Sequence, residues 1–361
     1  MAPCLQSWVG AVLVEYFVMP EVSVIVPCFN EEKTITLLLE AVYAQTYRRD
    51  EIEIIIADGM SSDATREKIT AFQRSHPDMA VRVVDNPKRN IPAGLNRAIE
   101  ASRGEFIVRL DAHSVPDRNY IARCLAGLRS GKGTNVGGIW QIEPGGEGWA
   151  ARSIASAAAH PLGVGDARYR VGGAAQAVDT VPFGAFRKTL IEEIGSFNED
   201  LLSNEDYEFN VRLRQAGGVI WMDPCIRTRY FARDNFGALA RQYWRYGYWK
   251  LKMLLRYPET FRWRQLAGAF VLNWLVVGVL AIGFTWARWL FLGEVMVYSL
   301  ILIAAGFHVA IRERDLPQML GVPLAIAIMH FAWGSGFLWS AVESFYIGIT
   351  SKIQRDGGRA R

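Results

Sequence analysis

Short apolar runs alternate with amphipathic segments through the first part of the chain. Such runs suit buried strands of a parallel sheet and are too short for typical helices. We expect strands at 22–26, 52–57, 81–84 and 106–110. Helices are expected between them at 33–45, at 62–74 and from Pro92, whose missing amide proton costs nothing at a helix start. The order strand, helix, strand, helix predicts right-handed βαβ units and an α/β domain.

The pattern is less regular after residue 116. We expect a helix near Asn119, strands at 135–142 and 178–182, helices at 149–160, near Thr189 and at 204–216, and a tight turn at 183–186. Residues 163–177 are rich in Gly, Ala and Arg and lack periodicity, which predicts a loop that orders over a ligand. Arg168 and Arg170 in this loop either meet a phosphate or are solvated charges.

A helix expected at about 236–257 divides its residues between two faces. One face is polar and aromatic (Arg241, Gln242, Arg245, Tyr246, Trp249, Lys252, Arg256), and the other is apolar (Tyr243, Trp244, Leu251, Leu254, Leu255). This division, in a basic stretch before an apolar run, predicts a helix in the membrane interface. Either its polar face, with Gln242 and Arg245, covers a ligand site of the α/β domain, or it binds only anionic headgroups.

Three long apolar runs follow residue 264 and predict membrane spans at 266–286, 290–311 and 322–349. Twenty-one residues at about 1.5 Å each cross the ~30 Å hydrocarbon layer. The basic stretch before the first run predicts a multi-pass protein of the inner membrane with its α/β domain in the cytoplasm. Three spans would place the basic carboxyl terminus outside. We favour a re-entrant hairpin at Gly334-Ser335-Gly336, which would return the terminus to the inside; the alternative is that the charge rule fails here.

Composition narrows the class of protein. The 361 residues carry a formal net charge of only +4 without a long single-sign run, so we expect no nucleic-acid partner. Cys4, Cys28, Cys124 and Cys225 are scattered, which excludes a CxxC zinc site and fits a reducing compartment. Residues 1–20 form a leader of uncertain status, and Met19 is an alternative start.

Polar residues gather at one predicted edge of the sheet. Asn30, Asp58 and Asp111 follow the first, second and fourth predicted strands, and His113 lies two residues beyond Asp111. Ligands of open α/β sheets bind beyond the carboxyl ends of strands, so Asp111 and His113 predict a divalent-cation and phosphate site. The alternatives are an Asx turn at Asp111 and a helix cap at Asp58.

Five motifs in order resemble the family 2 glycosyltransferases, above all the membrane-bound enzymes of exopolysaccharide synthesis of the succinoglycan type. They are Val-Ser-Val-Ile-Val-Pro-Cys-Phe-Asn-Glu-Glu at 22–32, Ile-Ala-Asp-Gly-Met-Ser-Ser-Asp at 56–63, Leu-Asp-Ala-His at 110–113, Asn-Glu-Asp at 204–206 and Gln-Tyr-Trp-Arg-Tyr at 242–246. The resemblance implies a GT-A fold, which is a Rossmann-like mixed sheet. It also implies an enzyme that uses a nucleotide sugar.

The resemblance implies a role for each matched residue. Pro27, Asn30, Glu31, Asp58 and Asp111 would bind the nucleotide, with Asp58 at the base. The family's metal motif is Asp-x-Asp, and here Asp111 and His113 would hold Mn²⁺ or Mg²⁺, with imidazole better suited to Mn²⁺. Asp206 would be the catalytic base beside Glu205, and Gln242 and Arg245 would complete the catalytic set. Without the resemblance, acidic residues in a first turn equally fit the helix dipole.

These inferences predict an inverting, metal-dependent glycosyltransferase with a UDP-sugar donor, a lipid-linked saccharide acceptor, and contacts with membrane lipids and other glycan-assembly proteins. The alternatives are sugar transfer to polyprenyl phosphate itself and a non-catalytic, membrane-tethered scaffold that binds nucleotide sugar. We expect a GT-A domain at 21–233, an amphipathic interfacial region at 234–264 and a membrane domain at 265–361.

Overall fold

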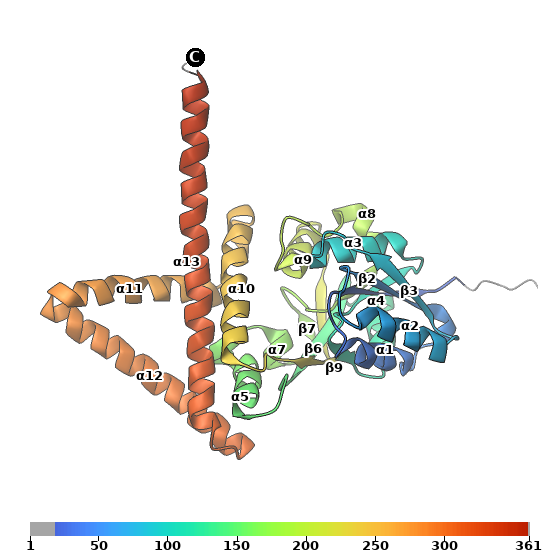
Figure 1. The fold of residues 1–361 in the computed structure, drawn as a ribbon, viewed down its shortest axis with the longest axis horizontal. Coiled ribbons are helices and arrows are strands. Elements are labelled where there is room, and N and C mark those ends of the chain that lie inside the picture. Colours follow the sequence, from blue (N-terminus) through green and yellow to red (C-terminus); the bar gives the residue numbers. More distant parts are fainter. Residues whose placement is uncertain (1–18, 360–361) are drawn as a thin grey trace, which may run out of the picture.

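The computed structural model describes residues 19–359, without side chains at 264 and 347–359. Most of the expectations for residues 1–20 therefore lie outside the described residues. A mixed nine-stranded sheet forms the centre of the α/β domain, in the order β3-β2-β1-β4-β8-β6-β9-β5, with β7 paired to β9 (Figure 1). Its strands are β1 (Val22–Cys28), β2 (Ile52–Asp58), β3 (Ala80–Asp85), β4 (Phe106–Arg109), β5 (Ser114–Pro116), β6 (Asn135–Glu143), β7 (Gln176–Ala177), β8 (Ala185–Arg187) and β9 (Ile220–Phe231).

The first half of the domain confirms the predicted βαβ pattern. β1, β2, β3 and β4 are parallel, and the strand order reverses between β1 and β4. The helices between them are α1 (Ile35–Tyr43), α2 (Thr65–Ser75) and α3 (Ile91–Ala101). The Asn90 side chain caps α3 by accepting from Ala93 N at 2.9 Å, and the predicted Pro92 lies in the first turn of this helix. A crevice opens where the strand order reverses, so the loops after β1 and β4 lie at the edge that binds ligands.

The second half departs from the prediction at two neighbouring segments. Residues 178–182 are not a strand, because Pro182 cannot donate to a ladder and Thr180 accepts from the Asn210 side chain. The predicted turn at 183–186 instead enters β8, which pairs antiparallel with both β4 and β6. Gly184 permits this because a Cβ there would lie 2.0 Å from Asn135 Oδ1.

Two further elements differ from the predicted ones. β9 is not among the predicted strands, because Asp223-Pro224 interrupts its alternation. The β6–β9 pairing accommodates this interruption by a register shift between Gly137 and Ile139 of β6. The expected loop at 163–177 contains two short helices, α6 (Pro161–Val164) and α7 (Arg168–Val171), and ends in β7.

Two apolar layers cover the sheet. β1 shows the alternation, since Val24 and Val26 join the layer formed with α1, α2 and α4 (Tyr120–Arg129), whereas Ile25 joins the layer formed with α3, α8 (Leu190–Ile194) and α9 (Glu205–Gln215). A third cluster joins α5 (Trp149–Ala158) and α10 (Phe236–Arg256) to the carboxyl-terminal helices. The α/β domain and these helices therefore share a core.

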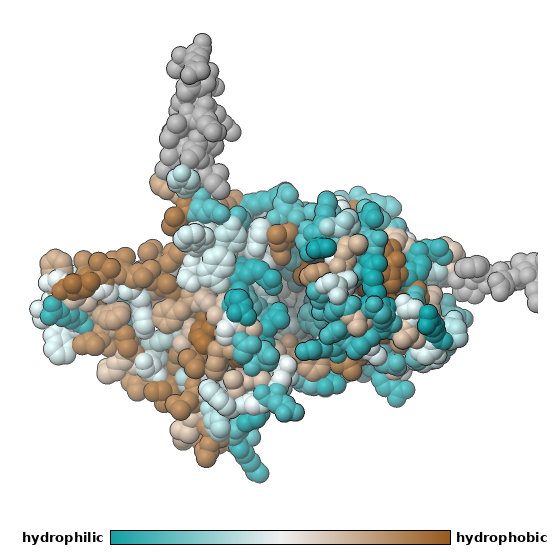
Figure 2. Space-filling model, in the orientation of Figure 1, coloured by the Kyte–Doolittle hydropathy of each residue, from teal (hydrophilic) through white to brown (hydrophobic). Residues whose placement is uncertain are grey.

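The carboxyl-terminal helices are α11 (Ala267–Gly283), α12 (Thr285–Glu313) and α13 (Gln318–Arg359). In Figure 1, α11 and α12 extend away from the α/β domain and return to α13, which stands beside α10. Within the described residues, α12 and α13 are the two helices long and apolar enough to cross a membrane. α11 has 17 residues and is shorter than the span predicted there. Figure 2 shows apolar surface over α11 and α12.

The hairpin favoured for residues 334–336 is wrong, because α13 continues through them as one helix. A Cβ at Gly334 would lie 2.4 Å from Val271 Cγ2 of α11, and one at Gly336 would lie 2.1 Å from Trp244 O of α10. Gly247 of α10 has the same role, since its Cβ would lie 1.9 Å from Trp333 O. These glycines mark close helix packing, as small residues do in membrane bundles.

Candidate active site

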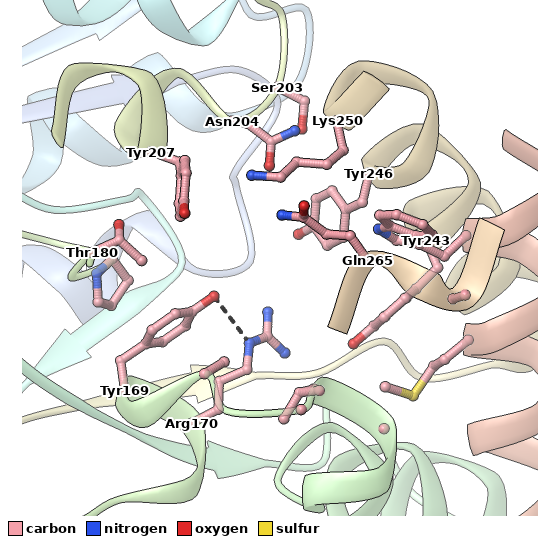
Figure 3. Close-up of a pocket in the computed structure, with 18 of the residues that line it drawn as sticks. Tyr169, Arg170, Thr180, Ser203, Asn204, Tyr207, Tyr243, Tyr246, Lys250 and Gln265 are labelled. Atoms are coloured by element: carbon pink, nitrogen blue, oxygen red, sulfur yellow. Dashed lines mark hydrogen bonds between the residues drawn. The ribbon is translucent and has the colours of Figure 1, made fainter. Parts of the chain in front are cut away.

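One cavity of about 630 Å³ extends from the carboxyl end of β4 to the carboxyl-terminal helices. Its polar end contains Asp111, Glu205 and Asp206. Aromatic and basic side chains line its middle, as Figure 3 shows for Tyr169, Arg170, Tyr243, Tyr246 and Lys250. Its far end is apolar and is formed by Phe270 of α11, Ile301 and Leu302 of α12, and Met329 and Trp333 of α13.

Arg109, the last residue of β4, organises the polar end. Its side chain is buried, and its Nη2 lies 2.9 Å from Glu205 Oε1 and 3.4 Å from Asp111 Oδ1. One guanidinium therefore draws the loop after β4 and the first turn of α9 together, although they lie almost a hundred positions apart. Arg109 is not among the predicted site residues. A basic residue inside an apolar strand requires an acidic partner, and this feature of the sequence could have indicated its role.

Asp206 follows Glu205 in the first turn of α9 and lines the same cavity as Asp111. Burial and the neighbouring Glu205 charge raise the pKa of the Asp206 carboxyl to about 7, although Arg109 opposes the rise. A carboxylate with this pKa can take a proton near neutral pH. Glu205 is held by Arg109, so Asp206 is the carboxylate that remains available to a ligand.

Asp111 and His113 lie where a metal is expected. The Asp111 carboxylate lines the cavity, and His113 Nδ1 lies 2.9 Å from Glu31 Oε1. When Nδ1 donates to Glu31, Nε2 is free to bind a cation, which is the usual arrangement of a metal-binding histidine. Among the described residues, no group of three or more His, Cys, Asp or Glu side chains is placed to share a metal. Two protein ligands still fit a divalent ion that is otherwise held by phosphates.

The nucleotide residues inferred from the resemblance form a network at the ends of β1 and β2. Asn30 has a positive φ of 54°; its backbone N donates to Ser61 Oγ at 2.8 Å, and its Oδ1 accepts from Ser62 N at 2.9 Å. Asp58 is fully buried and accepts from Ser61 and from Arg66 Nε at 2.6 Å. Asp58 therefore fixes this loop and the half-exposed Arg66. Pro27 is the next-to-last residue of β1. The Glu31 carboxylate accepts from Thr34 Oγ1 and lies 2.9 Å from His113 Nδ1.

The faces predicted for α10 are rotated from those observed. Arg245 and Tyr246 line the cavity, but Gln242 does not. Gln242 is buried and donates to Tyr230 Oη at 3.2 Å and Tyr246 Oη at 2.9 Å, so it positions these rings. The rotation arises because α10 packs on two sides: Met253 joins a cluster with Tyr207 and Val211 of α9, and Gly247 contacts α13.

The structure separates the two arginines of the 163–177 segment. Arg168 is exposed and does not line the cavity, whereas Arg170 lines it and lies 4.7 Å from the centre of the Trp140 ring. Several buried or partly buried donors of residues that line the cavity also have no hydrogen-bond acceptor in the part of the chain that the structure describes. They are Arg109 Nε and Nη1, Trp140 Nε1, Asn204 Nδ2 and Gln265 Nε2. Unpaired donors of this kind fit a ligand rich in oxygen acceptors.

Comparisons with known proteins agree with this geometry. A family model described as "Glycosyl transferase family 2" matches residues 23–195. The succinoglycan biosynthesis protein ExoA of Rhizobium meliloti is 28% identical over 325 residues, which cover 89% of this chain and 95% of that protein. A dolichyl N-acetyl-alpha-D-glucosaminyl phosphate 3-beta-D-2,3-diacetamido-2,3-dideoxy-beta-D-glucuronosyltransferase of Methanococcus voltae is 25% identical over 89% of this chain and 97% of its own.

A solved structure shares the fold. The mannosyltransferase PcManGT of Pyrobaculum calidifontis, in complex with GDP-Man and Mn²⁺, has a TM-score of 0.58 and 20% identity, covering 89% of this chain and 88% of its own. Its likeness, the family match and the mixed sheet agree with the predicted fold. Residues 23–195 thus form a glycosyl transferase family 2 domain with the GT-A fold, and the chain is a glycosyltransferase of this family.

Proposed function

We propose that this enzyme transfers a sugar, with inversion, from a UDP-sugar to a hydroxyl of a lipid-linked saccharide at the cytoplasmic face of the inner membrane. The product would serve exopolysaccharide or cell-surface glycan synthesis. The names of the relatives in Rhizobium meliloti and Methanococcus voltae support this class of acceptor and pathway. Those names give no support to a non-catalytic scaffold.

The continuity of the cavity carries the proposal. Its polar end contains Asp111 and Asp206, and its other end lies among apolar residues of α11, α12 and α13. A soluble acceptor would not need an apolar compartment that adjoins the catalytic carboxylates. A saccharide attached to a lipid matches both ends of the cavity, because its sugar suits the polar end and its lipid chain suits the apolar end.

The residues divide the reaction between them. Asp206 accepts the proton of the attacking hydroxyl while the new bond forms on the opposite face of the anomeric carbon from the departing nucleoside diphosphate, which inverts the configuration. Arg109 neutralises Glu205 and keeps Asp206 facing the cavity. Arg245, exposed at the cavity wall and without an ion-pair partner among the described residues, is placed to meet the leaving diphosphate.

Asp111 and His113 would hold the divalent cation, Mn²⁺ or Mg²⁺. Such a cation supplies charge neutralisation for the diphosphate. Asn30, Pro27 and Glu31 shape the loop that faces the nucleotide, and Asp58 holds that loop from below through Ser61 and Arg66. The nucleotide is then bound at the crevice between β1 and β4, as in other sheets whose strand order reverses.

The experiment incubates the purified full-length protein with Mn²⁺, a panel of nucleotide sugars and isolated membranes. We expect one donor to label a lipid-extractable product and Asp206→Asn to abolish the labelling. Glu193→Gln, an exposed carboxylate on α8, is the matched control and should keep full activity. Release of nucleoside diphosphate without a lipid-extractable product would refute the lipid-linked acceptor. Transfer to polyprenyl phosphate alone would support the alternative acceptor.

A further inference from the structure

Arg170 occupies an unusual place in the cavity. Its guanidinium lies 4.7 Å from the Trp140 ring centre, 5.6 Å from that of Tyr169 and 5.7 Å from that of Tyr230. Its one hydrogen bond among the described residues runs from Nε to Tyr169 Oη, at 3.4 Å. Figure 3 shows the guanidinium directed across the cavity. An arginine has five N–H donors, so most of its donors remain available to an anionic ligand.

Gln265 supplies a second, independent donor. Its side chain is only 4% exposed, its Oε1 accepts from Arg262 N at 3.0 Å, and its Nε2 has no acceptor among the side chains that the structure describes. It lies in the 3-10 turn Trp263–Leu266, directly before α11, and lines the same cavity as Arg170. A buried amide donor is costly unless a ligand or water satisfies it.

The two donors lie at the border between the polar and apolar parts of the cavity. Leu266 and Phe270 follow Gln265 along the chain into the apolar end. The segment that carries Arg170 is fixed to the membrane helices, since His330 of α13 lies 2.7 Å from Leu162 O through Nε2. Figure 3 shows Arg170 across the cavity from Asn204, the residue before Glu205 and Asp206. An anion held by Arg170 therefore lies across the cavity from the residue that precedes the Glu205–Asp206 pair.

We propose that Arg170 and Gln265 bind the phosphate group of the lipid-linked acceptor. Bidentate guanidinium–phosphate contacts and the Gln265 amide would fix the phosphate, and the isoprenyl chain would continue between α11, α12 and α13. The sugar nearest the phosphate then extends towards Asp206. This inference rests on the proposed function, and it selects a glycosylated phosphate over a bare polyprenyl phosphate as the acceptor.

The test measures equilibrium binding to the full-length protein in detergent by tryptophan fluorescence, because Trp140 lies under Arg170. The probes are farnesyl phosphate, farnesol, inorganic phosphate, phosphatidylglycerol and UDP. We expect the wild type to bind farnesyl phosphate about ten-fold or more tightly than farnesol, as a charged hydrogen bond predicts. Arg170→Gln and Gln265→Glu should abolish this difference, and all variants should bind UDP equally. Gln265→Glu keeps the oxygen that accepts from Arg262 N.

Arg168→Gln is the control, because Arg168 lies on the same short helix but outside the cavity. It should bind every probe like the wild type, and equal melting temperatures would show that the variants fold. Unchanged farnesyl phosphate binding in Arg170→Gln would overturn the proposal. So would a parallel loss of UDP binding, which would assign Arg170 to the donor. Equal binding of inorganic phosphate or phosphatidylglycerol would assign the site to a free phosphate or a bilayer lipid.

The proposed function can fail separately. If the subsite binds farnesyl phosphate through Arg170 but the membranes yield no lipid-extractable product, the acceptor class is refuted and the subsite stands. If the product forms at the wild-type rate in Arg170→Gln at limiting acceptor, the subsite is refuted and the acceptor class stands.

Discussion

At the residue scale, one buried arginine connects the elements of the catalytic centre. Arg109 is in contact with Glu205 and Asp111, and its Nε and Nη1 have no acceptor among the described residues. A cation in this place offsets the mutual repulsion of three carboxylates at one end of the cavity. It also makes the stability of the polar end sensitive to any substitution that removes the ion-pair partner of a buried charge.

Arg109→Met tests this dependence. Glu205, which is 5% exposed, would lose its only ion-pair partner among the described residues. We expect the free energy of unfolding to fall by about 3–5 kcal/mol, as for other broken buried pairs. Guanidinium denaturation of the detergent-solubilised protein measures the loss. Adding Glu205→Gln should recover part of it, and full stability of Arg109→Met alone would contradict the role of the pair.

Asp206 gives the protein a pH-dependent stability. Its pKa is about 7 when folded, against a usual value of 3.8, so the folded state binds the proton more tightly. The stability it contributes is fully present below about pH 4 and is lost as pH rises through 7. We therefore expect the melting temperature, measured in EDTA, to fall between pH 5 and pH 8. Asp206→Asn should flatten this decline, and Glu193→Gln should leave it unchanged.

At the scale of elements, glycines decide how α10, α11 and α13 meet. Gly247 and Gly336 allow the α10 and α13 backbones to approach closely, and Gly334 does the same between α13 and α11. Since α10 also carries Arg245 and Tyr246 into the cavity, the position of α13 sets the wall of the active site.

Gly247→Ala and Gly336→Ala test the packing of these helices. Alanine alone would favour a helix by about 0.5–1 kcal/mol. At these positions its Cβ would collide with backbone oxygens, so we expect destabilisation by about 1–3 kcal/mol or more and reduced transfer activity. Gly293→Ala on α12, where a Cβ meets nothing within 4 Å, should keep or slightly raise stability. Stability equal to that control would contradict the packing.

At the scale of the whole molecule, apolar surface and active site are parts of one structure. Exposed large apolar side chains line α11 and α12, among them Val279, Ile282 and Trp289. The same helices contribute Phe270, Ile301 and Leu302 to the cavity. These two helices therefore carry both the apolar surface that we expect to face lipid and part of the cavity end that we assign to a lipid chain.

Val279→Lys combined with Ile282→Lys should weaken membrane attachment. Each lysine costs about 2.5–3.5 kcal/mol within a hydrocarbon layer, so we expect a clear shift of the protein from the membrane to the soluble fraction after carbonate washing. Val219→Lys replaces an exposed apolar residue of the catalytic domain and should not change the distribution. Equal retention of both proteins in the membrane would contradict the role of α11.

The sequence predicts those features that depend on local pattern. The strands at the start of the chain, the helix that begins with Glu205 and the edge shared by Asn30, Asp58 and Asp111 all follow from periodicity and from the geometry of parallel sheets. The motifs also indicate the family. These predictions succeed because buried strands and amphipathic helices are determined by neighbours in the sequence.

Tertiary structure alone decides the remainder. β8 enters the sheet at a position that looks like a turn, because the space beside Gly184 is filled by Asn135 from another strand. Gln242 faces inward because α10 packs against both α9 and α13. The helix α13 continues through Gly334 and Gly336 because neighbouring helices pack closely against these two residues. The roles of Arg109, Arg170 and Gln265 can be assigned only from the structure, because distant segments of the chain meet in one cavity. Whether a buried charge or amide is paired depends on residues that are not its neighbours in the sequence.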